Sequence, residues 1–508
     1  MRLAGAVVLV GALAVSGCGK EAGTGILGPV DSVTSATSDA AAAITTALAG
    51  PAPADTAAPE ASGPDTDASG SPAPAESGAD TTPVPVTTKA PPRSTRDTLT
   101  VWVLPETPDA VLTRAGRLFA KDYPKVDVNL VRQDWATVTQ QLQDRLPTPE
   151  TPDVVEIANT QTAMLAGQGL IAGLEPARSD LRTEEWTKGL TGSTTLNDDL
   201  VAVPMYGFGR VVAYDQQAWK AAGVAAPPKS MTEFTDALER VQNGGVSTDY
   251  SAFWFPGRYW QGSLPWIWEE GGEIAELEQD TWTGTIDSGE SQAGLTQLQE
   301  LVRKFSRAPA DADETTAAQV KAFDEGRASA ALMLPYEIES LTRPHGVFAL
   351  PGKAKNSVAS QLIQGSDLAV SAASSRQGLA VAWLRAFLDP AVQDQFARTS
   401  GYLPALASAV KQLKGDPVTE AQADLADKGR FTPAAARWVD AEQQQILPDM
   451  LQTILTPPAP TSPSGSPSTG GASPGGENLP GSTGSVAPLP GAGEGGPLPT
   501  DGGTSPSR

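Results

Sequence analysis

Large apolar side chains are confined to the middle of the chain, and this confinement decides which part of it can fold. All 11 tryptophans lie within residues 97–456. The flanking stretches, 18–96 and 457–508, consist mainly of Ala, Pro, Thr, Ser, Gly and Asp. Such stretches bury too little apolar surface to offset the entropy of ordering, so we expect both to be disordered. The middle is long enough for two domains or two lobes of one protein.

Charge and cysteine content narrow the possible partners. The formal net charge is -23, and by difference about -17 of it falls on residues 97–456. An acidic surface repels phosphates, so we expect no nucleic-acid partner. The chain has one cysteine and one histidine, Cys18 and His345. A disulfide within the chain and a Cys/His metal site are therefore excluded, and we expect no metal and no cofactor.

The N-terminus has the pattern of a secretory signal. Arg2 is followed by a short apolar run, 3–15, which is too short to span a bilayer. Residues 15–18 (VSGC) resemble a bacterial lipobox, in which the cysteine becomes the lipid-modified mature N-terminus. We therefore predict a signal peptide over 1–17, lipidation at Cys18, and a tether over 18–96 on the extracytoplasmic face of the cell membrane. A multiply acylated cysteine would hold the chain firmly at that membrane.

The middle of the chain begins with alternating strand and helix patterns. Apolar residues alternate with period two around 99–103 and 126–130, and 153–157 (DVVEI) reads as a further strand. The segments between them, 111–119 and 135–146, place their apolar residues on one helical face. This order predicts an α/β fold with a largely parallel sheet. Ligands gather at the carboxyl ends of such strands, which makes 104–106 and 158–160 candidate site loops.

Several motifs resemble those of the family-1, maltose-binding type of extracellular solute-binding proteins, over about 98–406. They occur in that family's order, and together they are specific where one alone would be weak. The matching segments are 153–157 (DVVEI), 203–206 (VPMY), 210–215 (RVVAYD), 221–223 (AAG), 227–234 (PPKSMTEF), 268–272 (WEEGG), 286–290 (IDSGE), 323–333 (FDEGRASAALM), 364–370 (QGSDLAV) and 400–405 (SGYLPA).

The resemblance implies a fold and a function. The fold is two α/β lobes, a periplasmic-binding-protein-like architecture with a ligand cleft between the lobes. The function is delivery of a carbohydrate to the permease subunits of an ABC importer by a monomer whose lobes close around the ligand at a hinge. No reaction is implied, and we expect no enzyme activity.

Sugar sites combine aromatic rings, which stack on the C–H faces of the sugar, with polar groups that bind its hydroxyls. We predict ligand contacts from residues in loops or beside the family motifs. The aromatic candidates are Trp102, Tyr206, Trp266, Trp268, Tyr336 and Tyr402. The polar and loop candidates are Glu106, Asn159, Arg210, Glu269, Gly365 and Asp367.

Three other functions fit parts of the sequence. A surface sensor or binding lipoprotein for a non-sugar solute would share the fold, and a structural envelope lipoprotein would share the anchor. A secreted glycoside hydrolase would need two carboxylates facing each other across a bond, whereas the pairs here, 198–199 and 269–270, are neighbours in sequence. Ligand binding would exclude the structural lipoprotein.

Overall fold

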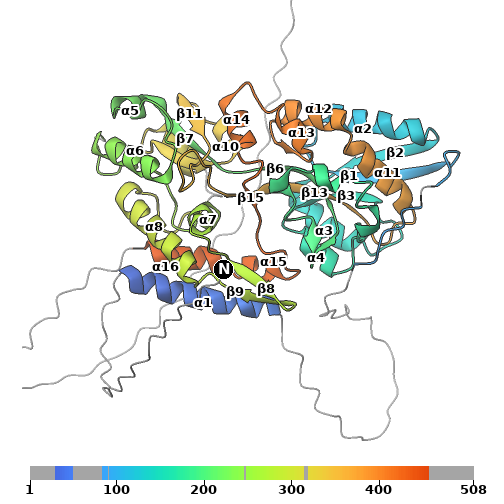
Figure 1. Cartoon of the computed structure of the whole chain (residues 1–508), viewed down its shortest axis with the longest axis horizontal. Helices are drawn as coiled ribbons and strands as arrows, with labels where there is room; N and C mark the ends of the chain where they lie inside the picture. The colour runs from blue at the N-terminus through green and yellow to red at the C-terminus, as the bar shows by residue number, and fades with distance from the viewer. Residues whose placement is uncertain (1–28, 50–82, 90, 245–246, 314–317, 457–508) are drawn as a thin grey trace, which may run out of the picture. The chain divides into compact units, whose positions relative to one another are not determined.

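The computed structural model describes residues 29–49, 83–89, 91–244, 247–313 and 318–456 (Figure 1). The predicted signal peptide, the lipidation site Cys18 and the C-terminal tail lie outside these residues. Within them the chain builds two lobes, each around its own sheet.

Lobe 1 is built on a six-stranded sheet with the strand order β14-β6-β13-β3-β1-β2. β1 pairs in parallel with β2 and β3, whereas β13 runs antiparallel to both β3 and β6, and β14 runs antiparallel to β6. The strands span β1 Asp97–Val103, β2 Val126–Arg132, β3 Val154–Ala158, β6 Val203–Phe208, β13 Gln364–Val370 and β14 Leu403–Pro404.

Helices cover both faces of this sheet, as expected for an α/β lobe. One group of helices packs on the sheet face that carries Val101, through the buried side chains of Phe119, Trp383 and Phe396. Leu142 belongs to the apolar cluster on the opposite face. The first group is α2 Asp109–Asp122, α11 Gln377–Phe387 and α12 Pro390–Ser400, and the second is α3 Trp135–Arg145 and α4 Thr162–Gly167.

The predicted strand and helix order from β1 to β3 is confirmed. The short elements that follow in lobe 1 are three 3-10 turns and a two-stranded ribbon. They span η1 Glu175–Ala177, η2 Thr183–Glu185, η3 Lys188–Leu190, β4 Thr195–Leu196 and β5 Asp199–Leu200, and α13 Ala407–Val410 follows β14.

Lobe 2 has an antiparallel sheet in the order β10-β7-β11, with most of its helices around an aromatic core that includes Phe234, Phe253 and Trp266. Its strands are β7 Val211–Asp215, β10 Ala330–Met333 and β11 His345–Phe348, and a separate hairpin is formed by β8 Ala275–Glu278 and β9 Thr281–Gly284. The helices are α5 Gln216–Ala221, α6 Met231–Gly244, α7 Trp260–Glu269, α8 Gly289–Phe305, α9 Ala318–Asp324 and α10 Pro335–Glu339, and the C-terminal part adds α14 Pro417–Ala423, α15 Trp438–Gln443 and α16 Ile446–Leu455.

The chain passes between the lobes more than once. The first crossing runs from β6 to β7 through Gly209 and Arg210, and another runs from β12 Gln361–Leu362 into β13. β12 also pairs with β15 Gly429–Arg430. Gln422 binds the first crossing at both ends of its amide: its Oε1 accepts from the Gly209 N–H at 2.9 Å, and its Nε2 donates to the Gly209 carbonyl at 3.0 Å. These bonds satisfy the N–H and the carbonyl of Gly209, which lies between β6 and β7 and pairs with no strand.

The prediction of a disordered tether over 18–96 is wrong for α1, which spans Pro29–Ala49 (Figure 1). Its buried residues recur every three or four positions, and they join the core of lobe 2 together with residues of α8, α15 and α16. Small side chains are sufficient to hold α1 in place because they pack on an apolar surface that lobe 2 already provides. The buried positions are Val33, Ala36, Thr37, Ala40, Ala41, Ile44, Ala47 and Leu48.

Replacing Ile44 with alanine is expected to lower the free energy of unfolding by about 2 kcal/mol, because the side chain is completely buried. Thr46→Ala, on the exposed face of the same helix, should change it by less than about 0.5 kcal/mol. Urea denaturation of the two variants measures both values. Equal stability of the two variants would show that α1 does not pack on lobe 2 in solution.

Candidate functional site

The edge of the lobe 1 sheet that faces the crossings collects several of the predicted residues. Because β1, β3 and β6 point the same way, their carboxyl ends meet at this edge, together with the amino ends of β13 and β14. Asn159 follows β3, Phe208 ends β6, and Tyr402 precedes β14. The loops 104–106 and 158–160 both belong to this edge, as their topology predicts.

Four aromatic rings from both lobes form what we call the interlobe aromatic cluster: Tyr206, Phe208, Tyr402 and Tyr336. The Tyr402 ring lies 5.5 Å from that of Tyr206 and 4.8 Å from that of Phe208. Tyr336, at the start of α10 in lobe 2, meets Phe208 edge to face at 6.5 Å. Tyr206 is almost fully buried, whereas Tyr336 is 54% exposed. The cluster thus runs from the core of lobe 1 to the surface of lobe 2.

Glu106 adds a carboxylate to this cluster. It accepts a hydrogen bond from the Trp135 indole N–H at 2.8 Å and a longer one, 3.4 Å, from the Tyr206 hydroxyl. Burial, followed by the charges of Glu156 and Glu106, raises the pKa of the Tyr206 hydroxyl far above its ordinary value. Burial likewise raises the pKa of Tyr402. Both phenols therefore stay protonated and can donate hydrogen bonds.

The sequence prediction missed Trp135 and Phe208. It placed Trp135 on the same apolar helical face as Val138 and Leu142, but Trp135 is 39% exposed and is the first residue of α3. The signal that could have identified Trp135 is its position directly after the N-cap residue Asp134, at the end of a strand–loop connection. Phe208 could have been found as the last residue of the strand that carries Tyr206.

Glu156 supports the loop that carries Glu106. Its carboxylate is buried and accepts from the Leu104 N–H at 2.7 Å, the Thr107 hydroxyl at 3.1 Å and the Ser366 hydroxyl at 2.7 Å. Burial raises the pKa of Glu156 to about 7, against the opposing effect of these hydrogen bonds. Glu156 lies on β3, so these bonds hold the turn after β1 against the neighbouring strand.

Asp367 is equally buried. Its carboxylate accepts from the hydroxyls of Thr162, at 2.7 Å, and Ser193, at 3.2 Å. Burial raises its pKa to about 7. This predicted ligand residue therefore hydrogen-bonds inside lobe 1, on the strand β13 that pairs with β3, and these bonds do not involve the aromatic cluster.

These two carboxyl groups predict a pH dependence of stability. Their pKa values are higher in the folded protein than in the unfolded chain, so between about pH 4 and pH 7 the folded state holds protons that the unfolded state releases. Folding is therefore favoured at acid pH, and this advantage is lost as the pH rises through 7. We expect the wild type to lose about 5 kcal/mol more than the double variant Glu156→Gln/Asp367→Asn between pH 5 and pH 8, with about half of this loss from each group. Urea titrations at both pH values measure the difference, and parallel pH profiles would contradict the prediction.

Asn159 and Gly365 hold the second crossing next to the cluster. The Asn159 side chain donates to the Ile363 carbonyl at 3.1 Å, and its backbone N–H donates to the Gly365 carbonyl at 3.1 Å. Gly365 has a φ of 153°, and a Cβ there would lie 2.2 Å from the Tyr206 carbonyl oxygen. Only glycine fits this close approach, so both predicted residues shape the backbone beside the cluster.

Arg210 lies in the first crossing, but it is 1% exposed. Its Nε donates to the Tyr259 hydroxyl at 2.8 Å, and Tyr259 donates in turn to the Leu332 carbonyl at 3.2 Å. The structure thus places Arg210 inside the junction between the lobes.

Four other predicted residues lie outside the cluster. Trp266 is part of the lobe 2 core, and Trp268 lies under the guanidinium of Arg430, 4.9 Å from its carbon. The Glu269 carboxylate accepts from the Lys353 N–H at 2.6 Å. Trp102 is half-buried and lines a pocket of about 600 Å³ beside α3.

A pocket of about 340 Å³ is lined by residues of both lobes and of the segment after β15. It combines aromatic and charged side chains. Its lining includes Lys188 and Gly192 from lobe 1, Glu273 and Trp282 from lobe 2, and Arg430 and Phe431.

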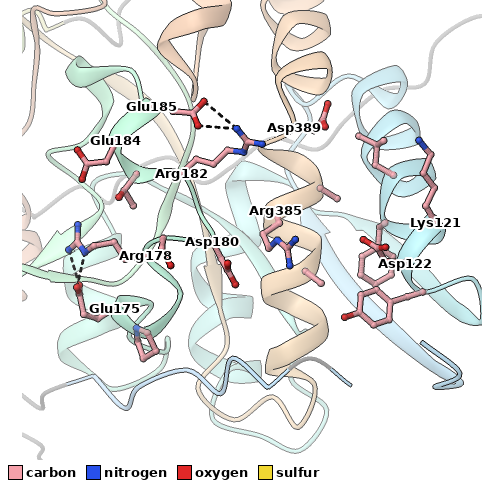
Figure 2. A pocket seen from close by; sticks show the side chains of 18 residues that line it. Lys121, Asp122, Glu175, Arg178, Asp180, Arg182, Glu184, Glu185, Arg385 and Asp389 are labelled. Atoms are coloured by element: carbon pink, nitrogen blue, oxygen red, sulfur yellow. Dashed lines mark hydrogen bonds and ion pairs between the residues drawn. The ribbon is translucent and has the colours of Figure 1, made fainter. Parts of the chain in front are cut away.

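A larger pocket, about 1060 Å³, lies on lobe 1 alone, between the end of α2, the segment around η1 and η2, and α11 (Figure 2). Its lining is strongly charged, and Figure 2 shows Arg178 paired with Glu175 and Arg182 paired with Glu185. Its aromatic residues, Phe119 and Tyr123, are buried. Size alone therefore does not select the functional site, and the interlobe aromatic cluster has the chemistry that suits a sugar.

Among the described residues, no group of three or more His, Cys, Asp or Glu side chains is arranged to hold a metal ion. No helix in the same residues has the length and hydrophobicity needed to cross a bilayer.

Comparison with known proteins agrees with this architecture. The diacetylchitobiose binding protein DasA of Streptomyces coelicolor is 29% identical over 369 residues, which cover 71% of this chain and 84% of that protein. The solved structure of the sugar-binding protein MalE from Xanthomonas citri matches with a TM-score of 0.59 and 18% identity, over 70% of this chain and 97% of that chain. A cyclo/maltodextrin-binding protein complexed with maltotetraose matches with a TM-score of 0.58 and 16% identity, over 71% and 96%.

These structures confirm the predicted two-lobed fold. A family described as bacterial extracellular solute-binding protein matches residues 115–426, more than half of the chain. The protein therefore belongs to the bacterial extracellular solute-binding proteins.

Proposed function

We propose that the protein binds a carbohydrate between its lobes and delivers it to the permease of an ABC importer. The interlobe aromatic cluster carries the proposal, because it joins stacking surfaces from both lobes to the Glu106 carboxylate. A ring from each lobe could contact one ligand, so that binding would favour the closed arrangement of the lobes. The family is one of binding proteins, which confirms the expectation that the chain is not an enzyme.

An oligosaccharide is the class of ligand that the proposal favours. The relative in Streptomyces is named for diacetylchitobiose, and one matched structure contains maltotetraose. Several aromatic rings in succession suit a ligand of more than one sugar ring, because each ring can stack on a separate sugar.

The proposal also includes a lipid anchor at Cys18, which would keep the protein on the extracytoplasmic face of the membrane as a monomer. What supports it is the lipobox-like sequence VSGC that ends in the only cysteine of the chain. Mass spectrometry of the protein extracted from bacterial membranes tests it: a diacylglyceryl-modified N-terminal peptide is expected, and an unmodified Cys18 would refute it.

A thermal-shift screen of the full chain tests the ligand. The panel contains diacetylchitobiose, maltose, maltotetraose and cellobiose, with amino acids and spermidine as controls. A ligand that binds only the folded state adds about 2.7 kcal/mol of stability at a hundredfold excess over its Kd. A shift with a sugar is expected. A shift with a control alone would favour a non-sugar binding protein or sensor, and no shift at all would favour a structural lipoprotein.

A further inference from the structure

We propose that α1 fastens lobe 2, and not lobe 1, to the membrane-proximal end of the chain, so that lobe 2 lies next to the lipid surface. The inference rests on the proposed anchor at Cys18. It predicts that lobe 2 lies closer to the lipid bilayer than lobe 1 does.

The first argument is that α1 is bound to three separate parts of lobe 2. The Gly284 N–H at the end of β9 donates to the Thr45 hydroxyl at 2.8 Å. Arg437, just before α15, donates to the Ala47 carbonyl at 3.3 Å. α1 also packs along α8 and α16. Because α1 has a continuous buried face and contacts several elements, it is firmly attached to lobe 2.

Close packing at Gly284 shows how tightly the helix sits. A Cβ on Gly284 would lie 2.4 Å from the Ala41 carbonyl oxygen. The backbones of α1 and β9 therefore approach each other as closely as in a packed core, because both residues are small.

The second argument is the length of chain between the anchor and each lobe. Residues 19–28 separate Cys18 from α1, and even fully extended they reach only about 40 Å. Among the described residues after α1, a contact with lobe 1 comes much later, where the Gly173 N–H donates to the Val84 carbonyl at 2.9 Å. If α1 were not docked, about 65 residues would separate Cys18 from that contact, with an extended reach of about 230 Å. Docking of α1 thus shortens the linker between Cys18 and the folded part of the chain several-fold, and it attaches this linker to lobe 2.

The outer face of α1 suits a position near a bilayer. Over residues 32–49, where the side chains of α1 are described, the exposed residues are small and Asp39 alone among them is charged, although the folded part of the chain is strongly acidic. Anionic lipids repel acidic surfaces, so this face costs little to bring close to them. The exposed positions are Thr34, Ser35, Ser38, Asp39, Ala42, Thr46 and Ala49.

Energy transfer from single labelled sites to the bilayer tests the orientation. Lipidation occupies the thiol of Cys18, so one introduced cysteine labels uniquely. Two exposed helical alanines form a matched pair: Ala293→Cys on α8 in lobe 2 and Ala120→Cys on α2 in lobe 1. The full lipidated chain, carrying a donor dye, is bound to vesicles of phosphatidylethanolamine and phosphatidylglycerol with a headgroup acceptor. We expect transfer at least twofold greater from position 293 than from position 120.

Undocking α1 should abolish this difference. Adding Ile44→Asp, which places a charge in the buried face, is expected to bring transfer from position 293 down to that from position 120. Thr46→Asp, on the exposed face, should leave it unchanged, and a cooperative thermal transition confirms that each variant folds. Equal transfer from both sites in the unmodified helix, or transfer from position 293 that survives Ile44→Asp, would overturn the inference. Failure of the wild type to co-float with vesicles would instead refute the anchor, and with it the proposed location.

Discussion

Replacement of Arg210 by alanine is expected to lower the free energy of unfolding by about 4 kcal/mol. The side chain is 1% exposed in the first crossing between the lobes, and its guanidinium stacks on Tyr259 with its carbon 5.4 Å from the ring centroid. The substitution removes the donor to the Tyr259 hydroxyl and leaves a cavity at a fully buried position. Urea denaturation monitored by tryptophan fluorescence measures the loss.

Arg178→Ala is the matched control. Arg178 is bound to the Glu175 carboxylate at 2.7 Å, but 40% of its side chain is exposed. An exposed pair contributes at most about 1 kcal/mol, so this variant should unfold close to the wild type. If Arg210→Ala unfolds within 1 kcal/mol of Arg178→Ala, the junction between the lobes is not held by this side chain.

Replacement of Tyr336 by alanine is expected to weaken sugar binding by 10- to 100-fold. The ring is the contribution of lobe 2 to the interlobe aromatic cluster, and it is 54% exposed. A ligand between the lobes would cover it, so most of its energetic value should appear only on binding. Because it is exposed, its loss should leave the free energy of unfolding unchanged within about 0.5 kcal/mol.

Calorimetric titration with the sugar found in the thermal-shift screen measures this effect. Leu130→Ala on β2 is the control, since Leu130 is a large apolar side chain, 39% exposed, outside the cluster. It should bind as the wild type does. Unchanged affinity of Tyr336→Ala would move the ligand away from the cluster, toward the pocket lined by Trp282 and Phe431.

The fold was predictable where the local pattern and the tertiary environment agree. The alternating strands and amphipathic helices from β1 to β3 follow from apolar spacing alone. The sequence also indicates a helix start with Asp287 or Ser288 as its cap, and in the structure Ser288 is the cap, since its side chain accepts from the Ser291 N–H. α1 was missed because its own side chains are too small to support a core. Its stability comes from a surface built by residues more than 200 positions later, which local composition does not reveal.

The site was only partly predictable, for a related reason. Sequence motifs identified Glu106, Tyr206, Tyr336 and Tyr402, which the structure brings together at one edge. They could not separate an exposed aromatic residue from a buried one, because Trp266 and Tyr336 both lie beside family motifs. Burial is decided by packing between distant elements, and the roles of the predicted residues as ligand contacts remain predictions for the titrations above.

The position of β13 has a consequence for how the protein is made. This strand lies between β3 and β6, yet it is synthesised after all three strands of the lobe 2 sheet. β3 and β6 cannot complete the lobe 1 sheet until residues 364–370 have emerged, so that sheet depends on contacts far apart in the chain and should form slowly. A chain that lacks residues 364–370 would thus remain unfolded in lobe 1 and could still pass through a narrow export channel. Lobe 1 would complete its folding only after β13 has crossed the membrane.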